Sequence, residues 1–246
     1  MTRSWHAPIG LATRGTVVLL PGRGEHAGVY ERFGRRLSGD AYAVHVLDVS
    51  ADHEATAVRH QVDALAASAV TPLVLAGSDT GALRVLELIR DGVTPDGLLL
   101  VGLPDPDETV AAGDWDWELA ARTTCPTHRA RLADDEDFVR GGLADPVPAP
   151  LAAALDETVL KGADLPALVL HGGADPIAPV AHAARVAELL PRAELAVVGP
   201  APHDVLNDAT HRTVAAQIVQ WLERLRGGPQ LDPILRVLSA SAPPRD

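Results

Sequence analysis

The sequence predicts an α/β protein with a mostly parallel, doubly wound sheet, and two observations support this fold class. Short runs rich in Val and Leu alternate along the chain with longer amphipathic stretches. Parallel strands that crossover helices bury on both faces produce this alternation. The chain of 246 residues is also long enough to bury a substantial core within a single domain.

The predicted elements follow from these runs. Six strands are predicted at residues 16–20, 42–48, 72–76, 97–102, 166–171 and 194–199. Helices are predicted at about 28–38, 53–69, 80–90, 179–190 and 209–226. Between about 103 and 160 the alternation stops, and six prolines punctuate short helical pieces. We therefore expect an α/β core of residues 1–102 and 161–226, a helical lid of residues 103–160, and a tail of residues 227–246 with one candidate helical turn around Ile234 to Leu238.

Composition and charge exclude several functional classes. The formal net charge is −12, and the Lys and Arg residues are scattered, which disfavours binding to nucleic-acid phosphates. No apolar run approaches the ~20 residues that span a bilayer, and the amino terminus lacks the apolar centre of a secretory signal. The single cysteine, Cys125, excludes an internal disulfide and a multi-cysteine zinc site. We expect a cytoplasmic protein.

The main functional motif is Gly77-Ser78-Asp79-Thr80-Gly81, which joins a predicted strand to a predicted helix. This is the context of a nucleophile elbow, in which outer glycines allow a close approach and the middle residue projects above the sheet. The middle residue is Asp79, whereas Ser78 is expected to point away. As an alternative, Asp79 only caps the helix, because Asp is a favoured N-cap residue.

Two more polar residues follow later strands. Asp175 lies in Gly172-Gly173-Ala174-Asp175-Pro176, and His203 lies in Pro200-Ala201-Pro202-His203-Asp204. Open α/β sheets build their sites at the carboxyl ends of strands, and the order nucleophile, acid, histidine is typical of the elbow-containing fold. Asp175 is therefore the candidate orienting acid, with Asp105 and Asp107 as alternatives, and His203 is the candidate base. Other histidines fall on helical stretches: His53, His60, His182 and His211.

A glycine-containing turn, Pro21-Gly22-Arg23-Gly24-Glu25-His26, follows the first predicted strand. Such a turn can aim a backbone N–H at the elbow, so the N–H groups of Arg23 and Thr80 are the predicted oxyanion-hole donors. A dinucleotide-binding loop is the competing interpretation, but the glycines here do not match the G-x-G-x-x-G spacing.

These stretches resemble the α/β-hydrolase superfamily, and within it the monoacylglycerol lipase and lysophospholipase-like branch. The resemblance rests on three segments, residues 17–30, 170–175 and 202–208, and it spans most of residues 16–226 outside the lid. It implies a catalytic triad and an acyl-binding pocket beneath a small cap. The chain departs from this branch at Pro21, where many members have histidine, and at Asp79, where they have serine.

Aspartate at the elbow changes the chemistry. A carboxylate with a reference pKa of ~3.9 is already ionised at neutral pH and needs no base to attack. Attack on an ester carbonyl would give an anhydride, whereas attack on an sp³ carbon with a leaving group gives a stable alkyl ester. His203 could then activate water to hydrolyse that ester. Epoxide hydrolases and haloalkane dehalogenases of the superfamily use such an aspartate, so we expect a small apolar epoxide or alkyl halide as substrate.

Help for the leaving group is harder to find in the sequence. Both tyrosines, Tyr30 and Tyr42, precede the elbow, so the lid offers no tyrosine to protonate an epoxide oxygen. Thr80 stands where dehalogenases commonly carry a halide-binding tryptophan. The candidate substrate-binding residues are His26, Trp115 and Trp117, while Arg23 and His128 are further candidates to stabilise an alkoxide.

Three alternative functions stay open at the level of the sequence. Asp79 could be a general base for water in a small-ester or thioester hydrolase of the lipase-like kind. Asp79 and His203 could move protons in a cyclase or lyase. The chain could also be a non-catalytic binding protein on the same fold. The expected partner is a small-molecule substrate, no cofactor or metal is expected, and the sequence does not predict an oligomeric state.

Overall fold

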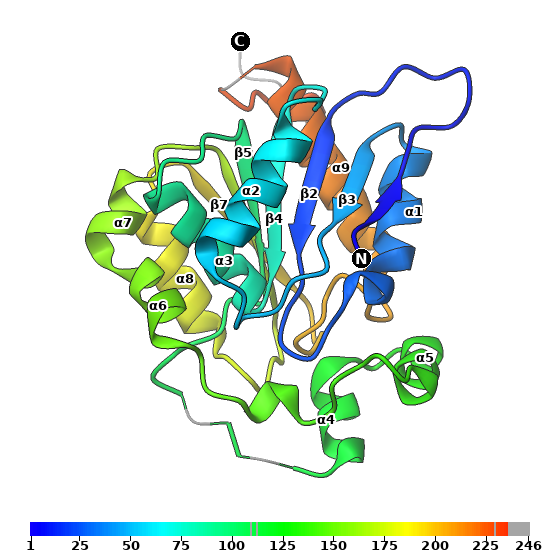
Figure 1. Cartoon of the computed structure of the whole chain (residues 1–246), viewed down its shortest axis with the longest axis vertical. Coiled ribbons are helices and arrows are strands. Elements are labelled where there is room, and N and C mark those ends of the chain that lie inside the picture. Colours follow the sequence, from blue (N-terminus) through cyan, green and yellow to red (C-terminus); the bar gives the residue numbers. More distant parts are fainter. Residues whose placement is uncertain (109, 112, 229, 236–246) are drawn as a thin grey trace, which may run out of the picture.

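The computed structural model describes residues 1–108, 110–111, 113–228 and 230–235. A seven-stranded sheet in the order β1-β3-β2-β4-β5-β6-β7 runs through its centre (Figure 1). β1 is antiparallel to β3, and each other neighbouring pair of this sheet is parallel. The strands are β1 (Arg3–Trp5), β2 (Thr16–Leu20), β3 (Ala43–Val46), β4 (Leu73–Ser78), β5 (Gly97–Val101), β6 (Ala167–Gly172) and β7 (Ala193–Val198).

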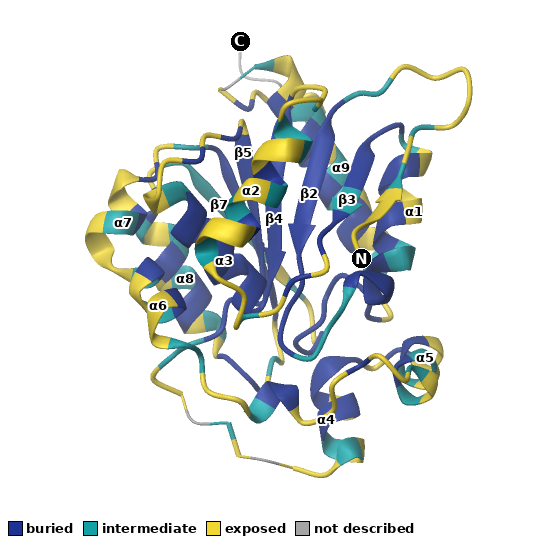
Figure 2. Cartoon of the chain, in the orientation of Figure 1, coloured by how far each residue is buried: buried dark blue, intermediate teal, exposed yellow. Residues whose placement is uncertain are grey.

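Helices cover both faces of this sheet. One face packs against α1 (Glu31–Gly39), which follows the 3₁₀ helix η1 (Ala27–Tyr30), and against α9 (His211–Gly227). The opposite face packs against α2 (Ala55–Ala66), α3 (Thr80–Arg90) and α8 (Val180–Leu189). The central strands β2, β4, β5 and β6 are buried, while the helices carry their exposed residues on the outward side (Figure 2). The predicted doubly wound α/β class is thereby confirmed.

The apolar runs form strands because successive side chains point to opposite faces. In β2, Val17 and Leu19 belong to the cluster on the α9 side, whereas Val18 and Leu20 belong to the cluster on the α3 side. All four side chains are fully buried. A strand covered by helices on both faces therefore needs a continuous apolar run, as the sequence shows.

Each predicted strand overlaps an observed one, and each predicted core helix overlaps α1, α2, α3, α8 or α9. The strand missing from the prediction is β1, which has only three residues, Arg-Ser-Trp. It lies at the edge of the sheet and is mostly exposed, so it lacks the apolar run by which the other strands were recognised.

The segment predicted as a lid divides into two parts. Its first part forms α4 (Trp115–Arg122), α5 (Pro126–Asp134) and the 3₁₀ helix η2 (Gly142–Ala144), and it lies beyond the carboxyl ends of the strands (Figure 1). Its last part forms α6 (Ala149–Ala152), η3 (Ala153–Leu155) and α7 (Glu157–Gly162), whose apolar residues join the cluster around α3 and α8. Only the first part therefore covers the carboxyl edge of the sheet, as a lid would. The division into core and lid domains stays a prediction.

Two further points concern membrane-spanning helices and the tail of the chain. None of the helices in the described ranges combines the length and the apolar character that crossing a bilayer requires. The candidate helical turn of the tail, around Ile234 to Leu238, falls mostly outside the described residues, the last of which is residue 235.

Candidate active site

The turn between β4 and α3 has the backbone geometry of a nucleophile elbow. Asp79 adopts φ 50° and ψ −125°, a strained combination for a residue with a side chain. A Cβ atom on Gly77 would lie 2.2 Å from the carbonyl oxygen of Gly81, and one on Gly81 would lie 2.1 Å from that of Leu20. Both outer positions therefore require glycine. Asp79 occupies the N-cap position of α3, but its side chain makes no capping hydrogen bond.

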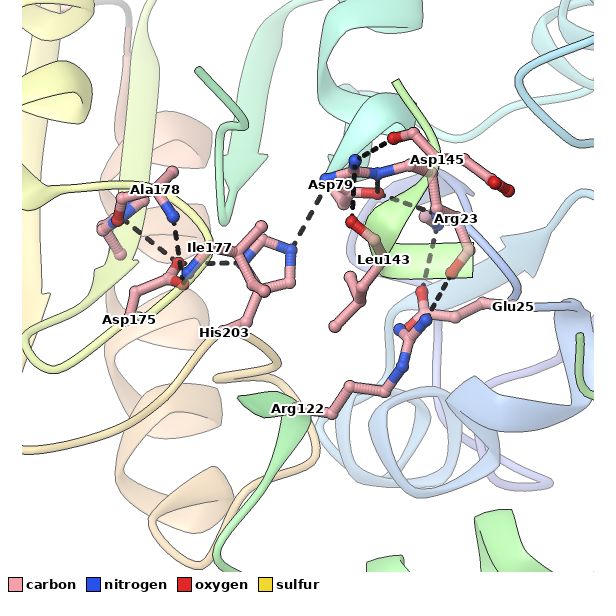
Figure 3. A network of polar contacts seen from close by, with 12 residues as sticks. Arg23, Glu25, Asp79, Arg122, Leu143, Asp145, Asp175, Ile177, Ala178 and His203 are labelled. Atoms are coloured by element: carbon pink, nitrogen blue, oxygen red, sulfur yellow. Dashed lines mark hydrogen bonds and ion pairs between the residues drawn. The ribbon is translucent and has the colours of Figure 1, made fainter. Parts of the chain in front are cut away.

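The carboxylate of Asp79 is bound by Arg23. Oδ2 accepts from the backbone N–H of Arg23 and from its Nε, each at 2.8 Å, and Oδ1 accepts from Nη2 at 2.8 Å. The remaining Nη1 donates to the carbonyl oxygens of Leu143 at 3.1 Å and Asp145 at 2.6 Å (Figure 3). Burial alone would raise the pKa of Asp79, but Arg23 and His203 hold it well below its usual value. Asp79 is therefore a carboxylate at neutral pH.

His203 lies between two carboxylates. Its Nδ1 is 2.8 Å from Oδ2 of Asp175, and its Nε2 is 3.5 Å from Oδ1 of Asp79 (Figure 3). At 3.5 Å the second contact is an ion pair, and Nε2 has no hydrogen-bond partner. Burial lowers the pKa of His203, but the two carboxylates more than compensate and raise it to about 10. The imidazole is thus charged at neutral pH in the resting site.

Asp175 is fixed by its own turn after β6. Its Oδ1 accepts from the N–H groups of Ile177 at 2.8 Å and Ala178 at 3.3 Å. Its Oδ2 lies 3.3 Å from Nε2 of His171, in addition to the contact with His203. The alternative acid Asp105 instead pairs with Nδ1 of His182 at 3.1 Å.

His171 was not predicted as a site residue. It is the last residue of the predicted strand 166–171, where the sequence gives no reason to separate it from the other strand residues. In the structure it is fully buried. Its position at the carboxyl end of that strand, four residues before Asp175, is the signal that could have identified it.

The loop that carries His203 is attached to the lid. The N–H groups of His203 and Asp204 donate to the carbonyl oxygens of Ala121 and Arg122 at 3.1 and 2.9 Å, at the end of α4. Asp204 also pairs with Nε2 of His128 from α5 at 3.0 Å. His128 therefore supports the loop beside the candidate base.

The loop that carries Arg23 is attached to the lid as well. Arg122 donates from Nη2 to the carbonyl oxygen of Arg23 at 2.8 Å and lies 3.3 Å from Oε1 of Glu25 (Figure 3). Oε2 of Glu25 in turn accepts from the N–H of Gly22 at 3.0 Å. These buried contacts orient the turn so that the N–H of Arg23 points at Asp79.

The structure brings Asp79, Asp175, His203 and Arg23 together at the carboxyl ends of the strands. The other predicted oxyanion-hole residue, Thr80, begins α3 directly after Asp79, and its hydroxyl is buried without a hydrogen-bond partner. Within the described ranges, no group of three or more His, Cys, Asp or Glu side chains is arranged to hold a metal ion.

The predicted substrate-binding residues have other contacts. His26 pairs through Nε2 with Asp135 at 2.9 Å, and its Nδ1 accepts from the N–H of Gly28. Trp115 packs on Phe138 and under the guanidinium of Arg140. Trp117 packs in a small apolar cluster with Ala121, Leu143 and Ile177. A role for these three residues in binding substrate stays a prediction.

The charged state of His203 predicts a pH dependence of stability. His203 has a folded-state pKa of about 10, above the usual value of ~6.5 for a histidine, so its contribution to stability is fully present below about pH 6.5 and is lost as the pH rises towards 10. We expect the free energy of unfolding to fall by about a few kcal/mol in this window. Urea unfolding across the window measures it.

A His203→Gln variant is the control for this effect. Its unfolding free energy should change much less between these pH values, because the titrating group is gone. Parallel pH profiles for the two proteins would show that His203 is not held in its charged form.

Comparison with known proteins relates this arrangement to solved structures. No family model matches the chain, and no curated protein sequence matches it. A monoacylglycerol lipase from Paleococcus ferrophilus superposes with a TM-score of 0.71 at 19% identity, covering 92% of this chain and 98% of that one. A soluble variant of monoglyceride lipase from Saccharomyces cerevisiae gives 0.75 at 18% identity, covering 91% of each chain. The chain has the α/β-hydrolase fold.

A thermophilic esterase from Thermogutta terrifontis is similar at a TM-score of 0.67 and 18% identity, covering 92% of this chain and 94% of that one. The fold predicted from the elbow and the ordered polar residues is therefore confirmed. Identities of this size establish the fold alone, so the activity has to be argued from the site.

Proposed function

We propose that this protein is a hydrolase that forms a covalent ester on Asp79 and hydrolyses it with water activated by His203. The observation that supports this best is the different surroundings of the two carboxylate oxygens. Oδ2 accepts the N–H of Arg23 at the predicted oxyanion hole, whereas Oδ1 faces Nε2 of His203. These contacts support a mechanism in which Oδ2 becomes the ester carbonyl oxygen and Oδ1 is the attacking oxygen beside the base.

The first step is attack by Oδ1 on an sp³ carbon. A bond forms between Oδ1 and this carbon, while the bond from the carbon to an epoxide oxygen or a halogen breaks and its electron pair leaves with that atom. Oδ2 becomes the carbonyl oxygen of the new ester and keeps the N–H of Arg23. Nη2 of Arg23 has to leave Oδ1 before the attack, because it occupies a lone pair there.

The second step uses His203 as a base. Esterification removes the charge of Asp79, which is one of the two carboxylates that raise the pKa of His203. This pKa therefore falls, and the imidazole gives its proton to the alkoxide oxygen of an opened epoxide or, when the leaving group is a halide, to water. Neutral His203, oriented by Asp175, takes a proton from water as the water attacks Cγ of Asp79. The N–H of Arg23 stabilises the negative charge on Oδ2 of the intermediate. The bond between Cγ and Oδ1 then breaks, Oδ1 leaves with the alkyl group and takes the proton from His203, and the new carboxyl group returns a proton to His203.

The alternative in which Asp79 is a general base receives less support. A general base works best when its pKa lies near the operating pH. Arg23 and His203 hold the pKa of Asp79 far below this range, so its carboxylate is a weak base. A cyclase or lyase that relies on Asp79 to remove a proton meets the same objection.

A non-catalytic binding protein is the second candidate, and one observation favours it. The side chain of Asp79 is 3% exposed and that of Arg23 is 6% exposed, so the pair is closed against solvent. In such a protein the Asp79–Arg23 pair would simply hold the elbow to the lid. This candidate predicts that Asp79 is never modified by a reactive ligand.

Trapping the ester distinguishes the two candidates. In a His203→Gln variant, attack by Asp79 should proceed, whereas hydrolysis of the ester should stop for want of a base. Incubation with 1,2-epoxybutane is expected to add the mass of the whole epoxide to the peptide that contains Asp79, as read by mass spectrometry. With 1-bromobutane the bromide leaves, so the peptide should gain only a butyl group in place of a proton.

Two control variants accompany this experiment. His60→Gln changes a histidine on α2 and should accumulate no adduct, and a His203→Gln/Asp79→Asn double variant should not be modified at this peptide. The covalent ester would be contradicted if the parent protein turns over both probes while the Asp79 peptide of the His203→Gln variant stays unmodified with both.

A further inference from the structure

We propose that a cavity of about 140 Å³ beneath the lid is the substrate pocket of this site, and that it takes a benzene-sized electrophile that is uncharged or cationic. Arg23 forms the wall between this cavity and Asp79. The catalytic use of the pocket rests on the proposed function, whereas binding to it does not. Its lining includes Arg23, Pro104, Ala144, Asp145, Val147 and Ile177.

The cavity is built from the same loops as the triad. Pro104 follows β5, and Ile177 lies two residues after Asp175, to which its N–H donates. Arg23 comes from the loop after β2, Ala144 is the last residue of η2, and Val147 follows it in the lid. The space therefore lies between the carboxyl edge of the sheet and the lid, where open α/β sheets bind their ligands.

Arg23 faces both the cavity and the nucleophile. Its Nε and Nη2 bind Asp79, while its Nη1 binds the carbonyl oxygens of Leu143 and Asp145 in the lid (Figure 3). Because Arg23 also lines the cavity, a molecule in that space is separated from Oδ1 of Asp79 by this guanidinium. Movement of Nη2 away from Oδ1 opens the path and frees the attacking oxygen in the same event.

The volume limits the size of the ligand. A cavity of about 150 Å³ in another protein binds benzene, and pockets for drug-sized ligands are about 300–1,000 Å³. At about 140 Å³ this cavity accepts a molecule of benzene size and does not accommodate a long acyl chain. The two lipases of similar fold therefore do not indicate the size of the ligand that this pocket takes.

The charges around the cavity disfavour an anion. The residues that line it include three acids, Asp105, Glu108 and Asp145, against a single arginine, Arg23. His182 and Arg185 pair with Asp105, and Arg23 pairs with Asp79, so Arg23 does not offset the charges of Glu108 and Asp145. An anionic ligand would meet a net negative surface, whereas an uncharged or cationic one would not.

Three probes with one carbon skeleton test the charge, and a fourth, longer probe tests the size. Isobutanol and isobutylamine are expected to shift the methyl NMR signals of Val147 and Ile177, whereas isobutyrate and the longer 1-octanol are not. None of these probes carries a leaving group, so binding is measured without turnover. Val147→Phe and Ala144→Leu should fill the cavity and weaken isobutanol binding by about tenfold or more, which is ~1.4 kcal/mol. Val139→Phe, at an exposed lid position, is the matched control.

The proposal is overturned if isobutanol leaves these methyl signals unchanged, if isobutyrate binds as well as isobutanol, or if neither cavity-filling variant weakens binding. Having two cavity variants guards against one of them failing to fold. Failure of the proposed function would look different. In that case the probes would still bind in the cavity, while Asp79 would not be modified by 1,2-epoxybutane or 1-bromobutane in the His203→Gln variant.

Discussion

Replacing Arg23 with methionine is expected to lower the free energy of unfolding by about 3–5 kcal/mol, because removing one partner of a buried ion pair leaves the other charge uncompensated. Both side chains of the Arg23–Asp79 pair are almost fully buried. The same substitution also removes the donors to the lid carbonyls of Leu143 and Asp145. Urea unfolding at neutral pH measures the loss.

A double-mutant cycle assigns this loss to the pair. Asp79→Asn alone should also destabilise the protein, and the Arg23→Met/Asp79→Asn double variant should lose less than the sum of the two. Arg140→Met removes an exposed guanidinium that lies over Trp115, so it should cost less than about 1 kcal/mol. Additive losses in the cycle would show that Arg23 and Asp79 do not depend on each other.

Replacing Asp79 with asparagine is expected to lower turnover of 1,2-epoxybutane by roughly 10⁴-fold or more, which is the scale for removing a nucleophile. The amide keeps the shape of the side chain and its place at the elbow, but it cannot attack as a carboxylate does. The substitution leaves the buried Arg23 without its counter-charge and so lowers the stability of the variant. The measurement is therefore kcat at a temperature well below the unfolding midpoint of the variant.

Asp164→Asn is the matched control for this substitution. Asp164 is an exposed acid outside the site, so its amide variant should keep the turnover of the parent protein. An Asp79→Asn protein that retains more than about a tenth of the parent turnover would place the nucleophile elsewhere.

The fold could be predicted in detail because its signals are local and repeated. Apolar runs such as Val17 to Leu20 are fully buried on both faces, so the strand leaves a continuous apolar pattern in the sequence. The elbow could be predicted for a similar reason. Its two outer glycines are required by close contacts between backbones, and such a requirement restricts the residue type at a fixed spacing.

The side-chain partners within the site could not be predicted in the same way. Arg23 was expected to contribute its backbone N–H, but nothing in the turn shows that its guanidinium reaches Asp79, 56 residues later in the chain. The only signal for His171 was its position at the carboxyl end of a strand, and the structure places its Nε2 3.3 Å from Oδ2 of Asp175. Contacts of this kind depend on how distant loops pack, and one sequence does not record that packing.

The substrate-binding residues were also hard to predict from the sequence. His26, Trp115 and Trp117 are the predicted candidates because their side chains suit a substrate, yet each has a packing or pairing partner of its own. The cavity instead uses small and apolar residues such as Ala144, Val147 and Ile177, which carry no chemical signature in a sequence. Residue chemistry in the sequence therefore indicated which polar groups lie together, but it did not indicate which residues line the cavity.

The covalent ester on Asp79 is tested most directly by the source of oxygen in its carboxylate. When the ester is hydrolysed by attack of water on Cγ, one oxygen of Asp79 is exchanged for an oxygen of that water. Turnover of 1,2-epoxybutane in heavy-oxygen water, followed by mass spectrometry of the peptide that contains Asp79, should show this label after many cycles and not in the Asp79→Asn variant. An active preparation whose Asp79 carboxylate stays unlabelled would contradict the covalent ester.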